Sequence, residues 1–541
     1  MSLPLSFAAK KPLDLRKRDY YTSCHQKQCF ININFINEEK GLIPYQVLLE
    51  RAANSPDSTA FISKKSGEVS FSQLAERTRR LAKGIADAGI GKGDVVGALL
   101  PNCMELVDIY IAAGAVGAVF QPMDFRFQGE ELRNTLVNTD VKMIFCHRSG
   151  VNEALEAVIP ASIQKVIIGG EKAGWTAYEK MFASTAGDIA PPELDEEKDI
   201  ALFLYTSGST SGIKCVPVTW RQLDFFPSDL MDAWDPDIFT RGISLLPLSH
   251  ISGPIVINFC LMSGGSYVIT DQLAPSSIIE LIEKHRVSWT HTVPSIAGLL
   301  LRGKPEKHDL SHFKFIALMG TSVPVSLLKE LERVIPSAVA VQGYGLTETS
   351  PLITLETPQD HKKKIGSIGK GLVGVDIRLV DKNGKDVPEG EPGEIIVRGP
   401  KVFSGYYGNP KLTAKVIRDG WFHTGDVARR DADGFYYHLG RLDDLIITGG
   451  LNVFPAEVEA VAAKYPGVKE SVAYAQPDPE RGAVLCLDVC PCDGAEIELP
   501  LLRRFLQKHL AAYKVPKQIH PVDEISHTPT GKPIREPKRE S

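Results

Sequence analysis

Long hydrophobic runs are missing from this sequence of 541 residues. No apolar stretch reaches the roughly 18 residues that a helix needs to cross a membrane. A strong charge of either sign is missing as well, because 61 Lys and Arg stand against 66 Asp and Glu, for a formal net charge of −5. The composition therefore argues against a nucleic-acid binder and against a membrane-surface binder.

Recognisable targeting signals are also missing. The N-terminal residues start apolar and turn basic, whereas a secretory signal has the reverse order and a longer apolar core. The final residues, KRES, match no C-terminal address such as Ser-Lys-Leu. We therefore expect a cytoplasmic protein.

Cysteine is scarce, with nine residues in all. A zinc site would need two well-spaced pairs of ligands and usable histidines, and the pair Cys24 and Cys29 has no such partner pair. Cys486 and Cys490 lie in the apolar segment AVLCLDVCP. We expect these two to be buried strand residues rather than metal ligands.

The pattern of apolar residues predicts an α/β fold. Helical patterns such as FSQLAERTRRLAKGIADAGI alternate with strand patterns such as DVVGALL, which is typical of largely parallel sheets covered by helices. Near Ile377 the pattern changes to hairpins, which predicts a β-rich subdomain. A small α+β unit of about 100 residues follows. We divide the chain into an N-terminal extension (1–41), a large domain (42–442) and a small, mobile domain (443–541).

The stretch LYTSGSTSGIKCV, residues 204–216, has the composition of an anion-binding loop. Hydroxyl groups, free backbone N–H groups and Lys214 can all face a phosphate. The spacing differs from the common P-loop, because Ile213 separates Gly212 from Lys214 and Cys215 follows it. A polar surface loop is the alternative interpretation of this stretch alone.

Three further stretches carry candidate nucleotide contacts. In GYGLTETS, Tyr344 can stack on a planar ring and Glu348 can bind Mg²⁺ through oxygen. In WFHTGDVARRDADGFYYHLGR, Asp426 can accept from ribose hydroxyls and Arg441 can donate. PTGKP places Lys532 in a glycine turn. Each stretch alone also fits an ordinary structural role, such as a helix cap, a charged hairpin or a solvated lysine.

Taken together and in this order, these stretches resemble the adenylate-forming superfamily of acyl- and aryl-CoA synthetases, luciferases and peptide-synthetase adenylation domains. The resemblance covers about residues 42–535, through YTSGSTSGIK, LPLSH, YGLTET, the stretch from Trp421 to Glu459, and PTGKP. It implies that a carboxylate attacks the α-phosphate of ATP, pyrophosphate leaves, and a thiol such as that of CoA attacks the acyl-adenylate. The protein would hold the anions together and neutralise phosphate charge.

The resemblance also assigns roles to individual residues. The nucleotide phosphates would contact the Ser/Thr-rich loop, whose matching residues are Thr206, Ser207, Gly208, Ser209, Thr210 and Lys214. Adenine would lie between two loops, whose matching residues are Gly320, Thr321, Ser322, Gly343, Tyr344 and Gly345. Thr347 would contact the α-phosphate and Glu348 would hold Mg²⁺. Asp426 and Arg441 would bind the ribose.

The remaining implied roles concern the acyl group and the thiol. Lys532 would bridge the carboxylate and the α-phosphate, a transient contact that suits the flexible point charge of lysine. The small domain would then rotate about Asp443 and bring Gly449 and Gly450 to the site, leaving room for the pantetheine arm of CoA. His250 lies where the superfamily places an aromatic gate beside the acyl carboxylate. The residues expected by position to line the acyl pocket are Phe225, Phe226, His250, Ile251, Thr321 and Leu346.

Some features depart from the superfamily pattern or leave alternatives open. The phosphate loop has Ser211 and Cys215 where the superfamily has glycines, and Thr321 with Ser322 replaces a Gly-Ala wall. The enzyme would use ATP, Mg²⁺ and CoA on a small carboxylic acid, either aromatic or of short to medium chain length. It could instead load a separate carrier protein, or be a catalytically impaired adenylate-binding homologue. A homodimer is an arrangement that the sequence leaves open.

Overall fold

The computed structural model describes residues 43–182, 189–190, 192–208, 212–448, 451–478, 482–492, 494–527 and 534–535. All of them belong to one unit, Gly41–Ser541. In this part of the chain, no helix has both the length and the hydrophobicity needed to cross a membrane.

The first sheet is parallel except at one edge, where β9 runs antiparallel to β8. Its order is β7-β6-β5-β3-β4-β8-β9. Every residue of β3 is buried, because helices cover both faces of a parallel sheet and its strands are therefore apolar throughout. The strands are β3 (Val95–Leu99), β4 (Val119–Met123), β5 (Val141–His147), β6 (Gln164–Ile168), β7 (Thr176–Ala177), β8 (Ile200–Gly208) and β9 (Gly212–Thr219).

The second sheet has the order β16-β15-β14-β13-β12-β10-β11-β1-β2. The strands from β14 to β1 are parallel, and antiparallel strands complete both edges. Its strands are β1 (Thr59–Ser63), β2 (Gly67–Ser70), β10 (Arg241–Ser244), β11 (Ser266–Ile269), β12 (Trp289–Thr292), β13 (Phe315–Leu318), β14 (Val339–Tyr344), β15 (Thr354–Leu355) and β16 (Lys370–Gly371).

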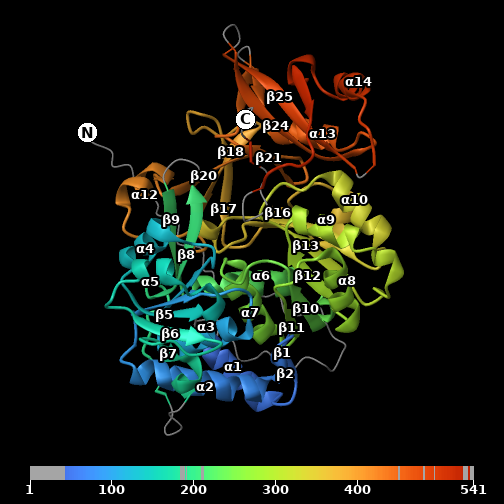
Figure 1. The fold of residues 1–541 in the computed structure, drawn as a ribbon. Helices are drawn as coiled ribbons and strands as arrows, with labels where there is room; N and C mark the ends of the chain where they lie inside the picture. Colours follow the sequence, from blue (N-terminus) through green and yellow to red (C-terminus); the bar gives the residue numbers. More distant parts are fainter. Residues whose placement is uncertain are drawn as a thin grey trace, which may run out of the picture. The chain divides into compact units, whose positions relative to one another are not determined.

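Helices pack between and around these sheets (Figure 1). One hydrophobic core joins Phe120 of β4, Ile109 of α3, Phe259 of α7 and Trp289 of β12, so α3 and α7 lie between the two sheets. Every residue of α3 is buried, which explains why its sequence is largely apolar, and its two carboxylates, Glu105 and Asp108, pair with Lys65 and Arg77. The α-helices are α1 (Pro44–Asn54), α2 (Phe71–Asp87), α3 (Met104–Ala115), α4 (Gly129–Asn138), α5 (Glu153–Val158), α6 (Gln222–Ala233), α7 (Ser252–Ser263), α8 (Pro275–Lys284), α9 (Pro294–Arg302), α10 (Val325–Val334), α11 (Pro358–Lys363), α12 (Pro410–Val416), α13 (Pro455–Ala462) and α14 (Leu499–His509).

The β-rich region expected after Ile377 is an antiparallel sheet. Its order is β17-β18-β20-β19, and β21 pairs with β20. The strands are β17 (Asp376–Val380), β18 (Gly393–Arg398), β19 (Ile417–Arg418), β20 (Trp421–Arg430) and β21 (Tyr436–Arg441). The hairpin that turns at Asp431–Gly434 places Asp426 directly opposite Arg441.

The strands that follow Arg441 pair only with one another in the described residues. They are β22 (Ile446–Thr448), β23 (Leu451–Val453), β24 (Val468–Asp478), β25 (Gly482–Pro491) and β26 (Gln518–Pro521). Cys486 and Cys490 are buried in β25, as expected from their apolar surroundings. The mixed α/β fold expected from the sequence is confirmed, while the boundary at Leu442–Asp443 stays a prediction.

One expectation about local structure was wrong. The sequence predicts a loop at LYTSGSTSGIKCV, residues 204–216, but β8 continues through Gly208 and β9 begins at Gly212. Thr206 pairs with Lys214 and Gly208 with Gly212 across this hairpin. Tyr205, Thr206 and Ile213 are residue types that favour strands, so the extended pairing reaches Gly208 and Gly212.

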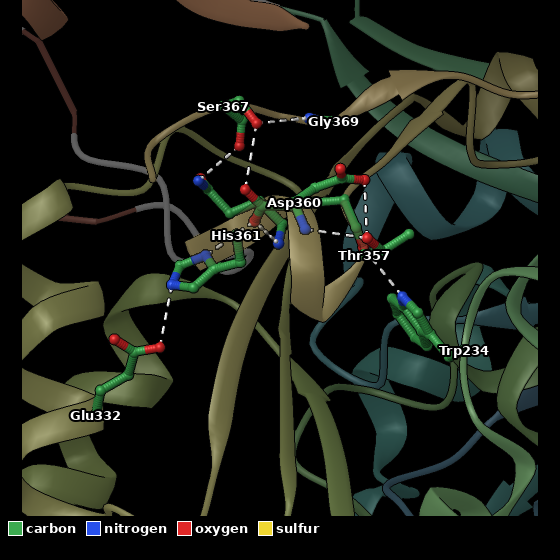
Figure 2. A network of polar contacts seen from close by, with 9 residues as sticks. Trp234, Glu332, Thr357, Asp360, His361, Ser367 and Gly369 are labelled. Atoms are coloured by element: carbon green, nitrogen blue, oxygen red, sulfur yellow. Dashed lines mark hydrogen bonds and ion pairs between the residues drawn. The ribbon is translucent and has the colours of Figure 1, made fainter. Parts of the chain in front are cut away.

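A buried polar cluster fastens β14 to α10 and α11. The Nδ1 atom of His361 lies 3.1 Å from Oε2 of Glu356, and its Nε2 atom lies 3.1 Å from Oε1 of Glu332. The second contact is an ion pair without hydrogen-bond geometry. Figure 2 shows the imidazole of His361 pointing at Glu332. Burial lowers the pKa of His361, but the two carboxylates outweigh it and raise the pKa above its ordinary value.

This raised pKa predicts how stability depends on pH. Protonated His361 stabilises the fold fully below its unfolded pKa of about 6.5, and the contribution is lost as pH rises through the raised folded pKa. We expect His361→Asn to lower the free energy of unfolding by about 3 kcal/mol near pH 6. The difference from wild type should narrow towards pH 9 in urea titrations. A pH-independent difference, or the same profile for His520→Asn at a more exposed histidine, would contradict this expectation.

Candidate active site

Parallel strands of the second sheet bring several predicted residues to one edge. β10, β12, β13 and β14 run in the same direction, so the segments that follow them meet at their carboxyl ends. These segments carry His250, Gly320–Ser322 and Tyr344–Glu348. Gly320 has a φ of +88°, which glycine adopts easily and which turns the chain just after β13.

Asp426 is the centre of a buried polar cluster that joins this edge to the hairpin of β20 and β21. The Tyr344 hydroxyl donates to Oδ2 of Asp426 at 2.7 Å, and Nη1 of Arg441 donates to Oδ1 at 3.2 Å. Asp426 is only 4% exposed. The structure thus brings together the residues predicted for adenine and for ribose, which are about 80 positions apart in sequence.

His438 belongs to the same cluster, although the sequence analysis did not select it. Its ring lies over that of Tyr344, with centroids 5.6 Å apart and planes 28° apart. Its Nδ1 atom is 2.7 Å from Oγ of Ser322, and its Nε2 atom is 3.6 Å from Oδ1 of Asp426. The signal in the sequence is a histidine three places before Arg441 in YYHLGR, but nothing there reveals its partner Ser322.

The neighbours of Asp426 and Tyr344 in this cluster shift the pKa values of both groups. Burial raises the pKa of Asp426, but His438, Arg441 and Tyr344 outweigh burial and hold this pKa below its ordinary value. Burial and the charge of Asp426 raise the pKa of Tyr344 well above its ordinary value. An ionised carboxylate therefore lies beside the neutral hydroxyl of Tyr344, and an acceptor of this kind suits the hydroxyl groups of a ribose.

If Asp426 binds the ribose, its removal should weaken ATP binding. We expect Asp426→Ala to raise the KM for ATP about 100-fold, because charge-assisted hydrogen bonds are lost and Arg441 is left without its carboxylate. The KM for the acid should change little. Steady-state kinetics with ATP varied, compared with the exposed-turn variant Asp433→Ala, measures this effect. Equal KM values for ATP in wild type and Asp426→Ala would rule out the ribose role.

Glu348 lies in a second cluster, at the predicted phosphate side. It belongs to the short 3-10 helix Thr347–Thr349 and is 7% exposed. The Tyr406 hydroxyl donates to Oε1 of Glu348 at 2.8 Å. Nζ of Lys214, from the hairpin strand β9, lies 5.5 Å from the centroid of the Tyr406 ring. Tyr406 thus lies between the predicted magnesium ligand and the predicted phosphate lysine, and the sequence analysis missed it.

The departure at Cys215 has a simple structural explanation. Cys215 lies in β9 with an ordinary strand conformation and is buried, and its carbonyl accepts from the Tyr407 N–H at 3.0 Å. Burial raises the pKa of its thiol to about 12. No glycine-specific backbone angle is needed at this position, so Cys215 is compatible with the hairpin.

The residues predicted to line the acyl pocket differ in their burial and in their neighbours. Ile251 is buried directly before α7, and Thr321 and Leu346 are half-buried at the strand edge. The Phe225 ring has Arg221 Cζ at 5.5 Å and Lys401 Nζ at 5.6 Å from its centroid.

One residue that the sequence analysis did not select, His291 of β12, lies near His250. The next residue of α6 after Phe225, Phe226, faces His291 of β12, with ring centroids 6.3 Å apart. Burial and the nearby His250 lower the pKa of His291 to about 4. A neutral imidazole and a phenyl ring therefore lie beside the predicted gate.

Several predicted residues lie outside the described residues. They are Ser209, Thr210, Gly449, Gly450 and Lys532. For Ser207 and Gly208 at the end of β8, only the backbone is described. Asp443, the predicted hinge, is exposed in a turn just after β21.

The fold and this site are those of a nucleotide-binding enzyme of the AMP-binding type. The sequence pattern of the family described as AMP-binding enzyme matches residues 48–407, and that of the AMP-binding enzyme C-terminal domain matches residues 457–532. The chain belongs to this family.

Relatives and solved structures agree with this assignment. A feruloyl-CoA synthase from Amycolatopsis sp is 34% identical over 90% of this chain and 96% of its own length. An indoleacetate–CoA ligase from Aromatoleum aromaticum is 30% identical over 86% of this chain and 91% of its own length. The structure of the o-succinylbenzoate CoA synthetase of Bacillus subtilis with its acyl-adenylate intermediate has a TM-score of 0.79 at 26% identity, covering 92% of this chain and 98% of that one.

Proposed function

We propose that this protein is an ATP-dependent carboxylic acid–CoA ligase that works through an acyl-adenylate. The observation that supports this most strongly is the Tyr344–Asp426–His438–Arg441 cluster at the carboxyl ends of the parallel strands. It presents a ring and an ionised carboxylate side by side, which suits a nucleoside. The named relatives are CoA ligases, which supports CoA as the acceptor.

The chemistry requires a charge balance that the described residues can supply. A carboxylate is unreactive towards a thiol because oxide would have to leave, whereas AMP leaves readily once an acyl-adenylate has formed. Lys214 and the backbone amides of the Ser/Thr-rich stretch would hold the departing pyrophosphate, and Thr347 would donate to the α-phosphate. Glu348 is a buried oxygen donor of the kind that Mg²⁺ prefers, and a bound Mg²⁺ would neutralise phosphate charge.

The acid itself is the finer part of the proposal. Phe226 and His291 lie beside His250, and the two named relatives act on ferulate and indoleacetate, which are aromatic acids. Flat rings favour contacts with aromatic side chains. We therefore favour an aromatic acid over an aliphatic acid of short or medium chain length.

The direct test uses the purified full chain with ATP, Mg²⁺, CoA and single acids. The panel is ferulate, indoleacetate, benzoate, butyrate, octanoate and oxalate, with AMP, pyrophosphate and acyl-CoA measured. The proposal expects AMP and pyrophosphate in equal amounts, with an aromatic acid as the best substrate. Release of ADP and phosphate would refute adenylation, and the strongest turnover with octanoate would refute the aromatic preference. Acyl transfer to a carrier protein but not to CoA would favour the carrier-loading alternative.

A further inference from the structure

We propose that Glu356 is a positioning residue of the nucleotide site, because it holds the backbones that carry Tyr344 and His438 in register. The inference rests on the proposed function, since adenine binding at Tyr344 is part of that proposal. Glu356 follows β15 and is fully buried, with an exposed fraction of 0%. A buried carboxylate is costly unless several donors satisfy it, so its contacts indicate what it organises.

The first route runs from Glu356 to Tyr344. Oε2 of Glu356 accepts from the backbone N–H of Gln342 at 3.1 Å, and the carbonyl of Gln342 accepts from the N–H of Glu356 at 2.9 Å. Gln342 lies two places before Tyr344 in β14, so both side chains point to the same face of the sheet. The carboxylate thus fixes the strand immediately before the ring that is expected to face adenine.

The second route runs from Glu356 to His438. Oε1 of Glu356 accepts from the Ser367 hydroxyl at 3.2 Å, and the carbonyl of Ser367 accepts from Nε2 of Gln342 at 2.8 Å. Figure 2 shows the Ser367 hydroxyl also meeting the N–H of Gly369, at 3.2 Å.

The segment after Ser367 carries this route into β21. The Ile368 N–H donates to the Tyr436 carbonyl at 2.8 Å, and the Tyr436 N–H donates to the Gly369 carbonyl at 3.0 Å. Tyr436 lies two places before His438 in β21. One carboxylate therefore connects two strands from different sheets, each of which carries a ring of the nucleotide site.

Further contacts support the positioning role. Burial raises the pKa of Glu356, while His361, the Gln342 N–H and the Ser367 hydroxyl oppose this rise. The backbone carbonyl of Glu356 accepts from Nε1 of Trp234 at 3.0 Å, so the end of α6 is attached to the same point. None of these groups is expected to contact a substrate, which separates Glu356 from the residues expected to contact ATP.

The test compares Glu356→Ala, Glu356→Gln and Ser367→Ala in the full chain. Glu356→Ala should raise the KM for ATP about tenfold and change the KM for the acid less than about twofold, because a network of buried hydrogen bonds is lost. Glu356→Gln should stay within about threefold of wild type, since its amide oxygen can accept from Gln342 and its NH₂ can donate to Ser367. Ser367→Ala, which cuts the second route alone, should raise the KM for ATP about threefold.

The matched control is Asp108→Asn in α3. Asp108 is also fully buried and pairs with Arg77 and Tyr178, outside the residues predicted to contact substrates. We expect it to lower the melting temperature without changing the KM for ATP. If Glu356→Ala behaves like this control, or raises both KM values equally, the positioning role is wrong. If Glu356→Ala does not fold, Ser367→Ala provides the test instead. An unchanged KM for ATP in Ser367→Ala would then refute the positioning role.

The two proposals can fail separately. Binding of AMP by equilibrium dialysis measures the nucleotide site without turnover. A wild-type protein that binds AMP but makes no acyl-CoA would contradict the proposed function, and the Glu356 variants would still weaken AMP binding if the positioning role holds.

Discussion

Lys532→Ala should abolish acyl-adenylate formation while leaving thiol transfer from a supplied acyl-adenylate close to the wild-type rate. Adenylation brings a carboxylate against a phosphate, and a single mobile cation between them offsets their repulsion. Once AMP is attached, the acid has lost its charge, so the second half-reaction no longer needs that cation. The two half-reactions are measured separately, by pyrophosphate release and by acyl-CoA formation.

A described residue of the same segment contacts the region of the predicted hinge. Three places after Lys532, Nη2 of Arg535 donates to Oε2 of Glu459 at 3.0 Å, and Nε of Arg535 lies 3.6 Å from Oδ2 of Asp444. Asp444 is next to the predicted hinge residue Asp443. A motion at the hinge would therefore carry the Lys532 segment with it, which fits a residue that serves one half-reaction only.

The control for this experiment is Lys538→Ala, which removes the same charge from the same segment outside the PTGKP motif. It should leave both half-reactions unchanged. Equal loss of both half-reactions in Lys532→Ala would contradict the division of roles, and so would an unaffected rate of pyrophosphate release.

Glu348→Gln should lower the rate of adenylation about 100- to 1000-fold, the typical effect of removing a group that stabilises transition-state charge. Glutamine keeps the shape and can still accept from the Tyr406 hydroxyl, which lies 2.8 Å from the carboxylate. It lacks the negative charge that makes a carboxylate the stronger ligand of a hard divalent cation. The variant should therefore need more Mg²⁺ for half-maximal rate, which a magnesium titration at saturating ATP measures.

A matched control separates this effect from a general loss of charge. Glu283→Gln alters a carboxylate on α8 that pairs with His308, outside the predicted site. It should leave the magnesium titration unchanged. If Glu348→Gln shows the wild-type magnesium curve and rate, Glu348 does not hold the cation.

Much of the fold could be predicted because it depends on local apolar patterns. The helix α2 illustrates this, since Leu74, Leu81 and Ile85 share one face and are fully buried, and the left-handed Gly89 follows its end. The stretch ELVDIYIAAGAVGAVF likewise indicated an apolar helix followed by a strand, and the structure has α3 and β4 there. Such patterns depend on which face of a segment packs against the core, and they do not depend on which distant segments it contacts.

The contacts between distant segments could not be predicted from one sequence. His438 and Ser322 meet because a hairpin of one sheet lies beside the strand edge of another. Tyr406 gains its position only when Glu348 approaches it from 58 residues away. In the sequence, Glu356 is a polar residue before Thr-Pro, which gives no indication of burial. In the structure, the strands around it bury it. Tertiary packing sets these contacts, and local pattern carries no record of them.

The most direct test of the central claim follows the α-phosphate through the two steps. The wild-type chain is incubated with Mg²⁺, ferulate and ATP radiolabelled in the α-phosphate, first without CoA and then with CoA added. The account predicts a labelled acyl-adenylate before CoA is present, and its conversion into labelled AMP and acyl-CoA afterwards. Label in ADP, or labelled AMP that forms only with CoA and without a preceding adenylate, would contradict the account.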